Sequence, residues 1–348
     1  MLTPSQGYFS TTPSKAACGP RPKRSAEAPT WQGLSVFAID GSKYTLPATE
    51  ELRTVFHPKS GLQHPGKGHY PQCLVSTVVD VFRRRPLART IVAIAQADER
   101  KQALALLPVV PPAGIILFDQ GYPGFDLIDA LRRQYAGFWV IRCPASGTFP
   151  AVEAFAQSGQ TEAVVTLTRA LRSPISLRAI RLLSPEGKVS VLLTNLPSES
   201  RFDASQIITL YFRRWAVETH YRDEKTCLGI ETFHSRTENG IRQELFAVLI
   251  VAVISRVLSV MTVDPNHPSK AESQLKHAII TTAQQASILI PCNPERALLL
   301  FRSALAEIKR VLYYPPKKPR PPQPRVSKRP SNKWQEHKTR RAYGQAGA

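Results

Sequence analysis

The sequence predicts an α/β domain built on a mixed sheet, with a β-rich insert and several helices after it. Strand-like and helical stretches alternate over residues 31–143, which is typical of a sheet flanked by helices. The short apolar run Gly114–Phe118 lies between two helical stretches, as a buried parallel strand does. A long helical stretch follows the β-rich region after Asp203.

The first half of the domain contains five predicted strands and two helices. The first strand, Leu34–Asp40, alternates apolar and polar residues and ends in the turn sequence Asp40-Gly41-Ser42. A basic proline turn separates the next two strands, so we expect a hairpin. The remaining expected elements, in order, are strands Cys73–Phe82 and Arg89–Ala97, helix Glu99–Leu107, strand Gly114–Phe118, helix Phe125–Tyr135 and strand Phe138–Cys143.

The second half is expected to be β-rich at first and then helical. Turn sequences at Ser146-Gly147 and Pro185-Glu186-Gly187 indicate short strands. Asp203, with Gln206 three residues later, predicts a helix start, and Gly229 predicts the end of that helix. Further helices are expected near 241–262, 270–290 and 294–312.

These patterns divide the chain into six expected segments. Both ends are rich in proline, and seven of the sixteen residues in 315–330 are Pro, which excludes helix and central strand there. In order, the segments are a flexible N-terminal segment 1–30, the first part of the core 31–143, a β-rich insertion 144–200, the long helix and the end of the core 201–262, C-terminal helices 263–314, and a disordered basic proline-rich tail 315–348.

The net charge points to a polyanionic partner. The chain of 348 residues has 46 Lys and Arg against 26 Asp and Glu, a formal charge of +20. Such an excess of basic residues indicates nucleic acid as a partner, and the alternative is a soluble protein with a basic surface. Ten of the basic residues lie in the tail 315–348.

The cysteines and apolar runs exclude several other protein classes. The five cysteines are scattered, without a C-x-x-C pair, which argues against a disulfide framework or a zinc ribbon and favours a reducing compartment. We expect no signal peptide, because the N-terminus lacks a charged start followed by an apolar stretch. The longest apolar run, Leu245–Ile254, is too short to cross a bilayer and is interpreted as part of a buried helix.

Two aspartates lie at the ends of predicted strands. Asp40 ends the first strand and Asp119 follows the run Gly114–Phe118. Open α/β sheets place their sites at the carboxyl ends of strands, and two carboxylates there would bind a hard cation such as Mg²⁺. Alternatively, each residue is an ordinary turn aspartate.

Four polar residues share one stripe of the long helix. Tyr211, Arg214, Glu218 and Lys225 have helical angles of about 0°, 300°, 340° and 320° at about 100° per residue. The alternative is a solvated pair between Arg214 and Glu218. The large rings of Tyr211 and Trp215 beside it favour a packed or binding surface instead.

This pattern resembles a known family. Tyr211-x2-Arg214-x3-Glu218-x6-Lys225 is similar to the Y-R-E-K signature of the bacterial DDE transposases of the insertion-sequence-four type. Asp40-Gly41-Ser42 resembles the first acidic motif of that family, and Asp119-Gln120-Gly121-Tyr122 resembles the second. The similarity covers about residues 34–260.

The resemblance implies a fold and a chemistry. It implies an RNase H-like core in which Asp40, Asp119 and Glu218 are catalytic and hold two Mg²⁺ ions, which Mn²⁺ could replace. The implied activity is metal-dependent DNA cleavage and strand transfer, with Tyr211, Arg214 and Lys225 binding DNA at the transposon end.

The resemblance also implies partners and a location. We expect DNA as substrate, a homodimer when DNA is bound, no membrane, and a bacterial cytoplasm with association to the nucleoid. Two features depart from the family: Gln120 replaces a common Arg, and the first acid, Asp40, lies so near the start that most of the N-terminal recognition region is expected to be missing. Alternative functions are a catalytically idle DNA-binding remnant and an RNase H-like nuclease that works outside transposition.

Overall fold

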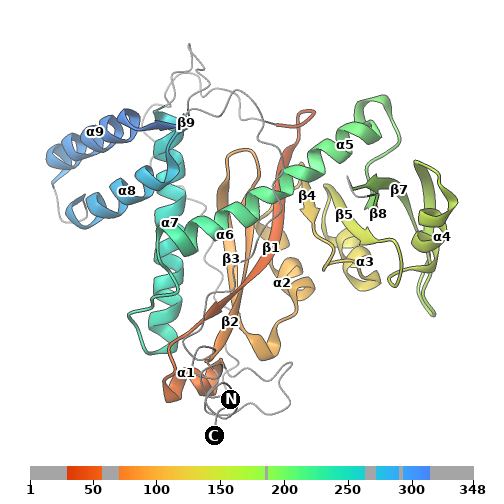
Figure 1. The fold of residues 1–348 in the computed structure, drawn as a ribbon, viewed down its shortest axis with the longest axis horizontal. Helices are drawn as coiled ribbons and strands as arrows, with labels where there is room; N and C mark the ends of the chain where they lie inside the picture. Colours follow the sequence, from red (N-terminus) through yellow and green to blue (C-terminus); the bar gives the residue numbers. More distant parts are fainter. Residues whose placement is uncertain (1–29, 57–69, 185–186, 263–271, 290–292, 314–348) are drawn as a thin grey trace, which may run out of the picture. The chain divides into compact units, whose positions relative to one another are not determined.

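The computed structural model describes residues 30–56, 70–184, 187–262, 272–289 and 293–313. An eight-stranded mixed sheet, flanked by helices, organises these residues (Figure 1). The predicted tail from residue 315 and nearly all of the predicted N-terminal segment lie outside the described residues.

The described residues form ten strands, nine α-helices and four 3₁₀ turns. The strands of the large sheet are β1 (Ser35–Thr45), β2 (Gln72–Asp80), β3 (Arg85–Ala93), β4 (Gly114–Phe118), β5 (Phe138–Pro144), β6 (Glu162–Leu167), β7 (Ile175–Leu183) and β8 (Val189–Thr194). The helices are α1 (Glu50–Val55), α2 (Glu99–Leu106), α3 (Phe125–Gln134), α4 (Pro150–Ser158), α5 (Ala204–Tyr211), α6 (Trp215–Cys227), α7 (Glu238–Met261), α8 (Leu275–Leu289) and α9 (Pro294–Arg310). A short pair of strands, β9 (Glu272–Ser273) and β10 (Leu312–Tyr313), and four 3₁₀ turns complete them: η1 (Ile94–Gln96), η2 (Leu107–Val109), η3 (Ser200–Phe202) and η4 (Phe212–Arg214).

The sheet has the strand order β3-β2-β1-β4-β5-β8-β7-β6. The first three strands form an antiparallel meander, so the predicted hairpin is confirmed. Strands β4 and β5 run parallel to β1, and all five residues of β4 are buried, as its apolar run predicts. The predicted α/β class is confirmed, and the arrangement is consistent with an RNase H-like core.

The side chains of β1 and β4 point alternately into two hydrophobic cores, one on each face of the sheet. Phe37 and Ile39 pack with residues of α2, α3 and α4. Val36 and Ala38 belong to the other core, together with residues of α5, α6 and α7. Successive side chains of a strand point to opposite faces, so residues of even number in this part of β1 face α6.

Two helical features differ from the sequence prediction. Residues 144–200 contain helix α4 as well as strands β6 to β8, and β8 pairs with β5 and so extends the main sheet. Pro150 at the start of α4 and Gly159, with φ of 76° at its end, are the usual helix boundary signals. These signals were present in the sequence, but the turn residues around them favoured strands.

The long helix predicted after Asp203 is not one continuous α-helix. Asp203 caps it as expected, since its carboxylate accepts a hydrogen bond from the Ser205 amide. The helix then passes from α5 through η4 into α6, and Figure 1 shows α5 and α6 following one another across the sheet. A 3₁₀ segment inside a helix often marks a functional or strained position, and Arg214 lies at its end.

A buried ion pair fixes α6 against the sheet. The guanidinium of Arg89, on β3, contacts the carboxylate of Glu224, on α6, and the two side chains are 0% and 1% exposed. The hydroxyl of Tyr44, on β1, donates to the same carboxylate at 2.9 Å. Arg89 also donates to the carbonyl of Leu245 at 2.9 Å and thereby holds α7. One carboxylate therefore joins α6 to β1 and β3, and its partner Arg89 extends the connection to α7.

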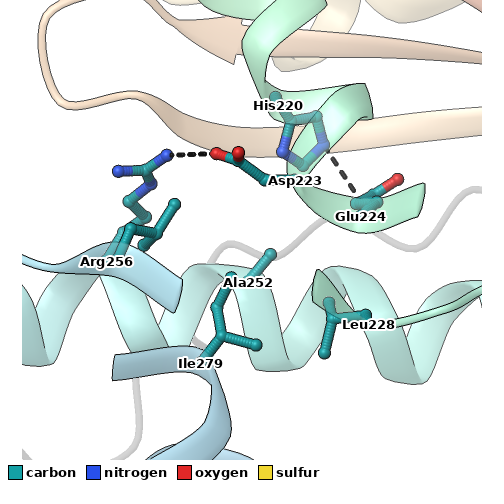
Figure 2. Close-up of a pocket in the computed structure, with 8 residues that line it drawn as sticks. His220, Asp223, Glu224, Leu228, Ala252, Arg256 and Ile279 are labelled. Carbon is teal, nitrogen blue, oxygen red and sulfur yellow. Dashed lines mark hydrogen bonds and ion pairs between the residues drawn. The ribbon is translucent and has the colours of Figure 1, made fainter. Parts of the chain in front are cut away.

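A small pocket lies where α6 meets α7 and α8. Figure 2 shows His220, Asp223 and Glu224 of α6 facing Ala252 and Arg256 of α7 and Ile279 of α8. Arg256 bonds Asp223 at 3.2 Å, and His220 Nε2 lies 3.2 Å from Glu224. The residues that line this pocket include none of the three predicted catalytic acids. We therefore attribute its polar contacts to helix packing.

Helix α7 contains the apolar run that the sequence predicts to be a buried helix. Its buried residues Ile241 and Leu245 belong to the core on the α6 face of the sheet, and Leu258 packs with α8 and α9. Ile250 and Ile254 are exposed. Among the described residues it is the one helix long and apolar enough to cross a membrane by length and composition. A core helix meets the same criterion, so this finding carries no further conclusion.

Replacing Glu224 by Gln should strongly destabilise the protein. The substitution leaves the buried guanidinium of Arg89 without its counter-charge, and breaking a buried pair costs about 3–5 kcal/mol of unfolding free energy. Urea denaturation at pH 7 measures this. The matched control is Glu231→Gln, because that carboxylate is 45% exposed beside Lys225, and it should change stability by less than about 0.5 kcal/mol. Equal stability of the two variants would contradict the role given to Arg89.

Candidate active site

The parallel register of β1 and β4 brings the two aspartates to the same level of the sheet. Ala38 pairs with Leu117 at the end of this ladder, and Asp40 and Asp119 each lie two residues beyond that pair. Because side chains alternate, both aspartates fall on the face occupied by Val36, Ala38, Ile115 and Leu117. That face is covered by α5 and α6.

The third acid comes from α6. Glu218 lies in the first turn of that helix. Tyr221, one turn later, is buried, and its hydroxyl lies 2.7 Å from the carbonyl oxygen of Asp40 and 2.9 Å from that of Val75. These contacts fix the first turns of α6 to the middle of β1 and to β2. The prediction that Asp40 ends the first strand in a turn is wrong, because β1 continues to Thr45 and pairs with β2 through Gly41 and Ser42.

Arg214 contacts the carboxylates of all three acids. Its guanidinium lies 2.7 Å from Glu218, 3.5 Å from Asp119 and 3.6 Å from Asp40. The side chain of Arg214 is only 4% exposed. The predicted acids Asp40, Asp119 and Glu218 therefore converge on one point, and the alternatives of separate turn aspartates and a solvated Arg214–Glu218 pair do not describe this arrangement.

The negative charges of the three acids exceed the positive charge of Arg214. Burial raises the pKa of Asp40 to about 6, although the Gly41 amide and Arg214 oppose the shift. Burial also disfavours the charged form of Arg214, yet Asp119, Tyr211 and Glu218 together raise its pKa. Among the residues that the structure describes, the three carboxylates thus share a single contacting guanidinium, that of Arg214. A further cation would relieve the repulsion between them.

Two predicted site residues make different contacts from those expected. Tyr211 is 3% exposed, and its hydroxyl donates to Asp119 at 3.3 Å. The ammonium of Lys225 donates to the Lys43 carbonyl at 2.7 Å and lies over the ring of Tyr44. Tyr211 therefore joins the acid cluster, whereas Lys225 lies further along α6 against β1. Their predicted contacts with DNA remain predictions.

The donor set suits a hard divalent cation. Mg²⁺ and Mn²⁺ prefer carboxylate oxygens, and the three carboxylates already surround a cationic group. Among the described residues, however, no three His, Cys, Asp or Glu side chains are arranged to hold a metal ion as they stand. The guanidinium of Arg214 occupies the centre of the group. It would have to move before all three acids could bind one ion.

Sequence reasoning missed the residues that support this site. Glu224 lies away from the polar stripe of the helix and carries no local signal of burial. Its partner Arg89 is 135 residues distant, so no local pattern connects them. A charged residue inside a β-branched strand was the available hint, because such residues are seldom buried unless they are paired.

Comparison with known proteins identifies the family. A family model described as a transposase DDE domain matches residues 31–254. The chain belongs to the DDE transposase family. This confirms the resemblance to transposases of the insertion-sequence-four type, because the chain is 24% identical over 261 residues to the InsG transposase of insertion sequence element IS4 from Escherichia coli K12.

Other relatives of this DDE transposase are also transposases. The chain is 27% identical over 150 residues to a probable transposase of insertion sequence element IS5377 from Geobacillus stearothermophilus, covering 41% of this chain and 39% of that one. The match to InsG covers 70% of this chain and 58% of InsG, so the chain spans little more than half of that relative. A cryo-EM structure of a piggyBac transposase synaptic complex with hairpin DNA is similar with a TM-score of 0.45 and 12% identity, over 84% of this chain and 60% of that chain.

The pKa of Asp40 predicts a pH-dependent stability in the metal-free protein. The folded-state pKa of about 6 exceeds the ordinary value of 3.8, so between these values the unfolded chain releases a proton that the folded chain retains. Stability should therefore fall as pH rises from 4 to 6, by up to about 2 kcal/mol. Asp40→Asn should remove this component in denaturation measured with a chelator present. Parallel pH profiles for the two proteins would contradict it.

Proposed function

We propose that this DDE transposase cleaves DNA and transfers strands, with Asp40, Asp119 and Glu218 as its catalytic carboxylates. The observation that supports the proposal is the convergence of these three side chains on Arg214, from β1, from the end of β4 and from α6. The membership of the chain in the family supports the same reaction class.

In this proposal the acids hold divalent metal. Bound Mg²⁺ or Mn²⁺ would activate the attacking oxygen and stabilise the leaving oxygen of the phosphodiester. Asp40 and Asp119 hold their positions through the paired strands β1 and β4, and Glu218 through the helix anchored by Glu224. Rigid elements therefore position each ligand.

Arg214 has two roles in this proposal. Without metal its guanidinium neutralises part of the charge of the three acids. When metal replaces it, the guanidinium becomes available for a phosphate oxygen of DNA, with which it can make bidentate hydrogen bonds. Tyr211 and Lys225 would contribute further DNA contacts on the same side of the helix. This exchange reconciles the predicted DNA contact of Arg214 with the carboxylate contacts observed.

DNA is the proposed partner, at the transposon end and at the target. The formal charge of +20 supports a polyanionic partner. We further propose that the DNA-bound form is a homodimer in the bacterial cytoplasm, associated with the nucleoid. The six segments expected from the sequence are proposed as the domain organisation.

One observation favours a second function, that of a catalytically idle DNA-binding remnant. No described group is arranged to hold a metal as it stands, and Arg214 occupies the centre of the acids. Such a protein would bind DNA through phosphates, with an affinity that falls steeply with salt, and would leave the DNA uncut when Mg²⁺ is added.

Glu218→Gln should abolish Mg²⁺-dependent DNA nicking. Loss of one metal ligand removes several kcal/mol of transition-state stabilisation, which corresponds to a rate loss of at least about 100-fold. The variant should still bind DNA in a gel-shift assay, since the substitution removes a negative charge. Glu231→Gln, in the turn that follows α6, should nick at the wild-type rate. Nicking by wild type with no effect of Glu218→Gln would refute the assignment, and absence of nicking by wild type would favour the idle remnant.

A further inference from the structure

A fourth carboxylate lies beside the acid cluster. Glu99 is the first residue of α2, directly after the helix cap Asp98. Helix α2 packs on the face of the sheet opposite to α6, where its residues Ala103 and Leu106 belong to the first core. Glu99 thus approaches the middle of β1 and the end of β4 from the other side.

The two glycines next to the catalytic aspartates give Glu99 its space. A Cβ added to Gly41, which follows Asp40, would lie 2.8 Å from one carboxylate oxygen of Glu99. A Cβ added to Gly121, two residues after Asp119, would lie 3.5 Å from the other oxygen. The carboxylate of Glu99 therefore lies against both segments that carry the predicted metal ligands.

The carboxylate of Glu99 has no partner of its own within the part of the chain that the structure describes. Neither a hydrogen bond nor an ion pair joins it to a described residue. Burial, followed by the charge of Asp119, raises the pKa of Glu99, although the nearby Lys43 and Arg100 oppose the shift. Lys43 itself is exposed, so water weakens its compensation.

A second observation points to a ligand at the same place. Tyr122 is 0% exposed, and its hydroxyl has no hydrogen-bond partner among the described residues. Burial, and then the charges of Asp40 and Glu99, raise the pKa of Tyr122 well above its ordinary range. The hydroxyl therefore lies in the field of these carboxylates. Buried hydroxyls are normally hydrogen-bonded, so this one indicates a missing water or other ligand beside the acids.

We propose that Glu99 is a fourth carboxylate of the metal site, binding the divalent cation together with Asp40 and Asp119, directly or through bound water. This inference rests on the proposed metal-dependent function. It adds to Asp40, Asp119 and Glu218 a residue from a different helix, which packs on the opposite face of the sheet. The unpartnered hydroxyl of Tyr122 would hydrogen-bond the water that accompanies the ion.

A purely structural role of Glu99 predicts the opposite effects. As a first-turn acid, Glu99 would stabilise α2 through the helix dipole, so its loss would lower the melting temperature of the metal-free protein and leave metal affinity unchanged. If Glu99 is instead a metal ligand among other negative charges, neutralising its side chain should leave the melting temperature of the metal-free protein equal or higher. It should also diminish the stabilisation that added metal produces.

The experiment titrates the full chain with Mn²⁺ and monitors free Mn²⁺ by its electron paramagnetic resonance signal. Melting curves of the same proteins are recorded with and without Mg²⁺. Glu99→Gln should weaken Mn²⁺ binding at least about tenfold. The matched control is Glu153→Gln, which alters the first-turn glutamate of α4. That helix packs near β6 and β8, so the control should bind Mn²⁺ like wild type.

The outcomes separate this inference from the proposed function. Equal Mn²⁺ affinity of wild type and Glu99→Gln would overturn the role of Glu99 and leave Asp40, Asp119 and Glu218 as the proposed ligands. Weakened binding in Glu99→Gln, with no DNA nicking by wild type, would support the four-carboxylate site and refute the activity. Absence of Mn²⁺ binding to wild type would overturn both.

Discussion

The candidate site depends on one buried contact, the ion pair of Arg89 with Glu224. A buried charge pair is costly unless its geometry is satisfied, and it is retained where it specifies one arrangement. Here it fixes α6 in register with β1 and β3, with Tyr44 as a third partner. Glu218 lies six residues before Glu224 on the same helix, so its position against the strand ends follows from this anchor.

The second constraint is the excess of negative charge where β4 ends beside the middle of β1. Parallel pairing of β1 and β4 brings Asp40 and Asp119 to one level, and α6 adds Glu218. One guanidinium cannot balance these groups, and Glu99 adds a further charge from the opposite face. A site that gathers carboxylates at such an energetic cost is typical of function rather than of stability. In the proposed function, divalent metal bound beside DNA would balance this charge.

Local sequence patterns predicted most of the sheet, whereas only the resemblance to the family implied that the three acids act together. The alternation of β1, the apolar run of β4 and the caps around Asp203 act over a few residues, so they can be read without the fold. The break at η4 could not be predicted, because it coincides with the long-range contacts of Arg214. Arg89 with Glu224, and Glu99 against Gly41, join residues far apart in the chain, and no local pattern encodes such pairs.

The position of bound metal tests the account most directly. A crystal of the protein soaked in Mn²⁺ locates the ion by its anomalous scattering. The account predicts a peak within about 2.3 Å of carboxylate oxygens of Asp40, Asp119 and Glu218, with the Arg214 guanidinium displaced from the contacts that it makes here. A peak elsewhere, or no peak with Arg214 still among the three acids, would contradict it.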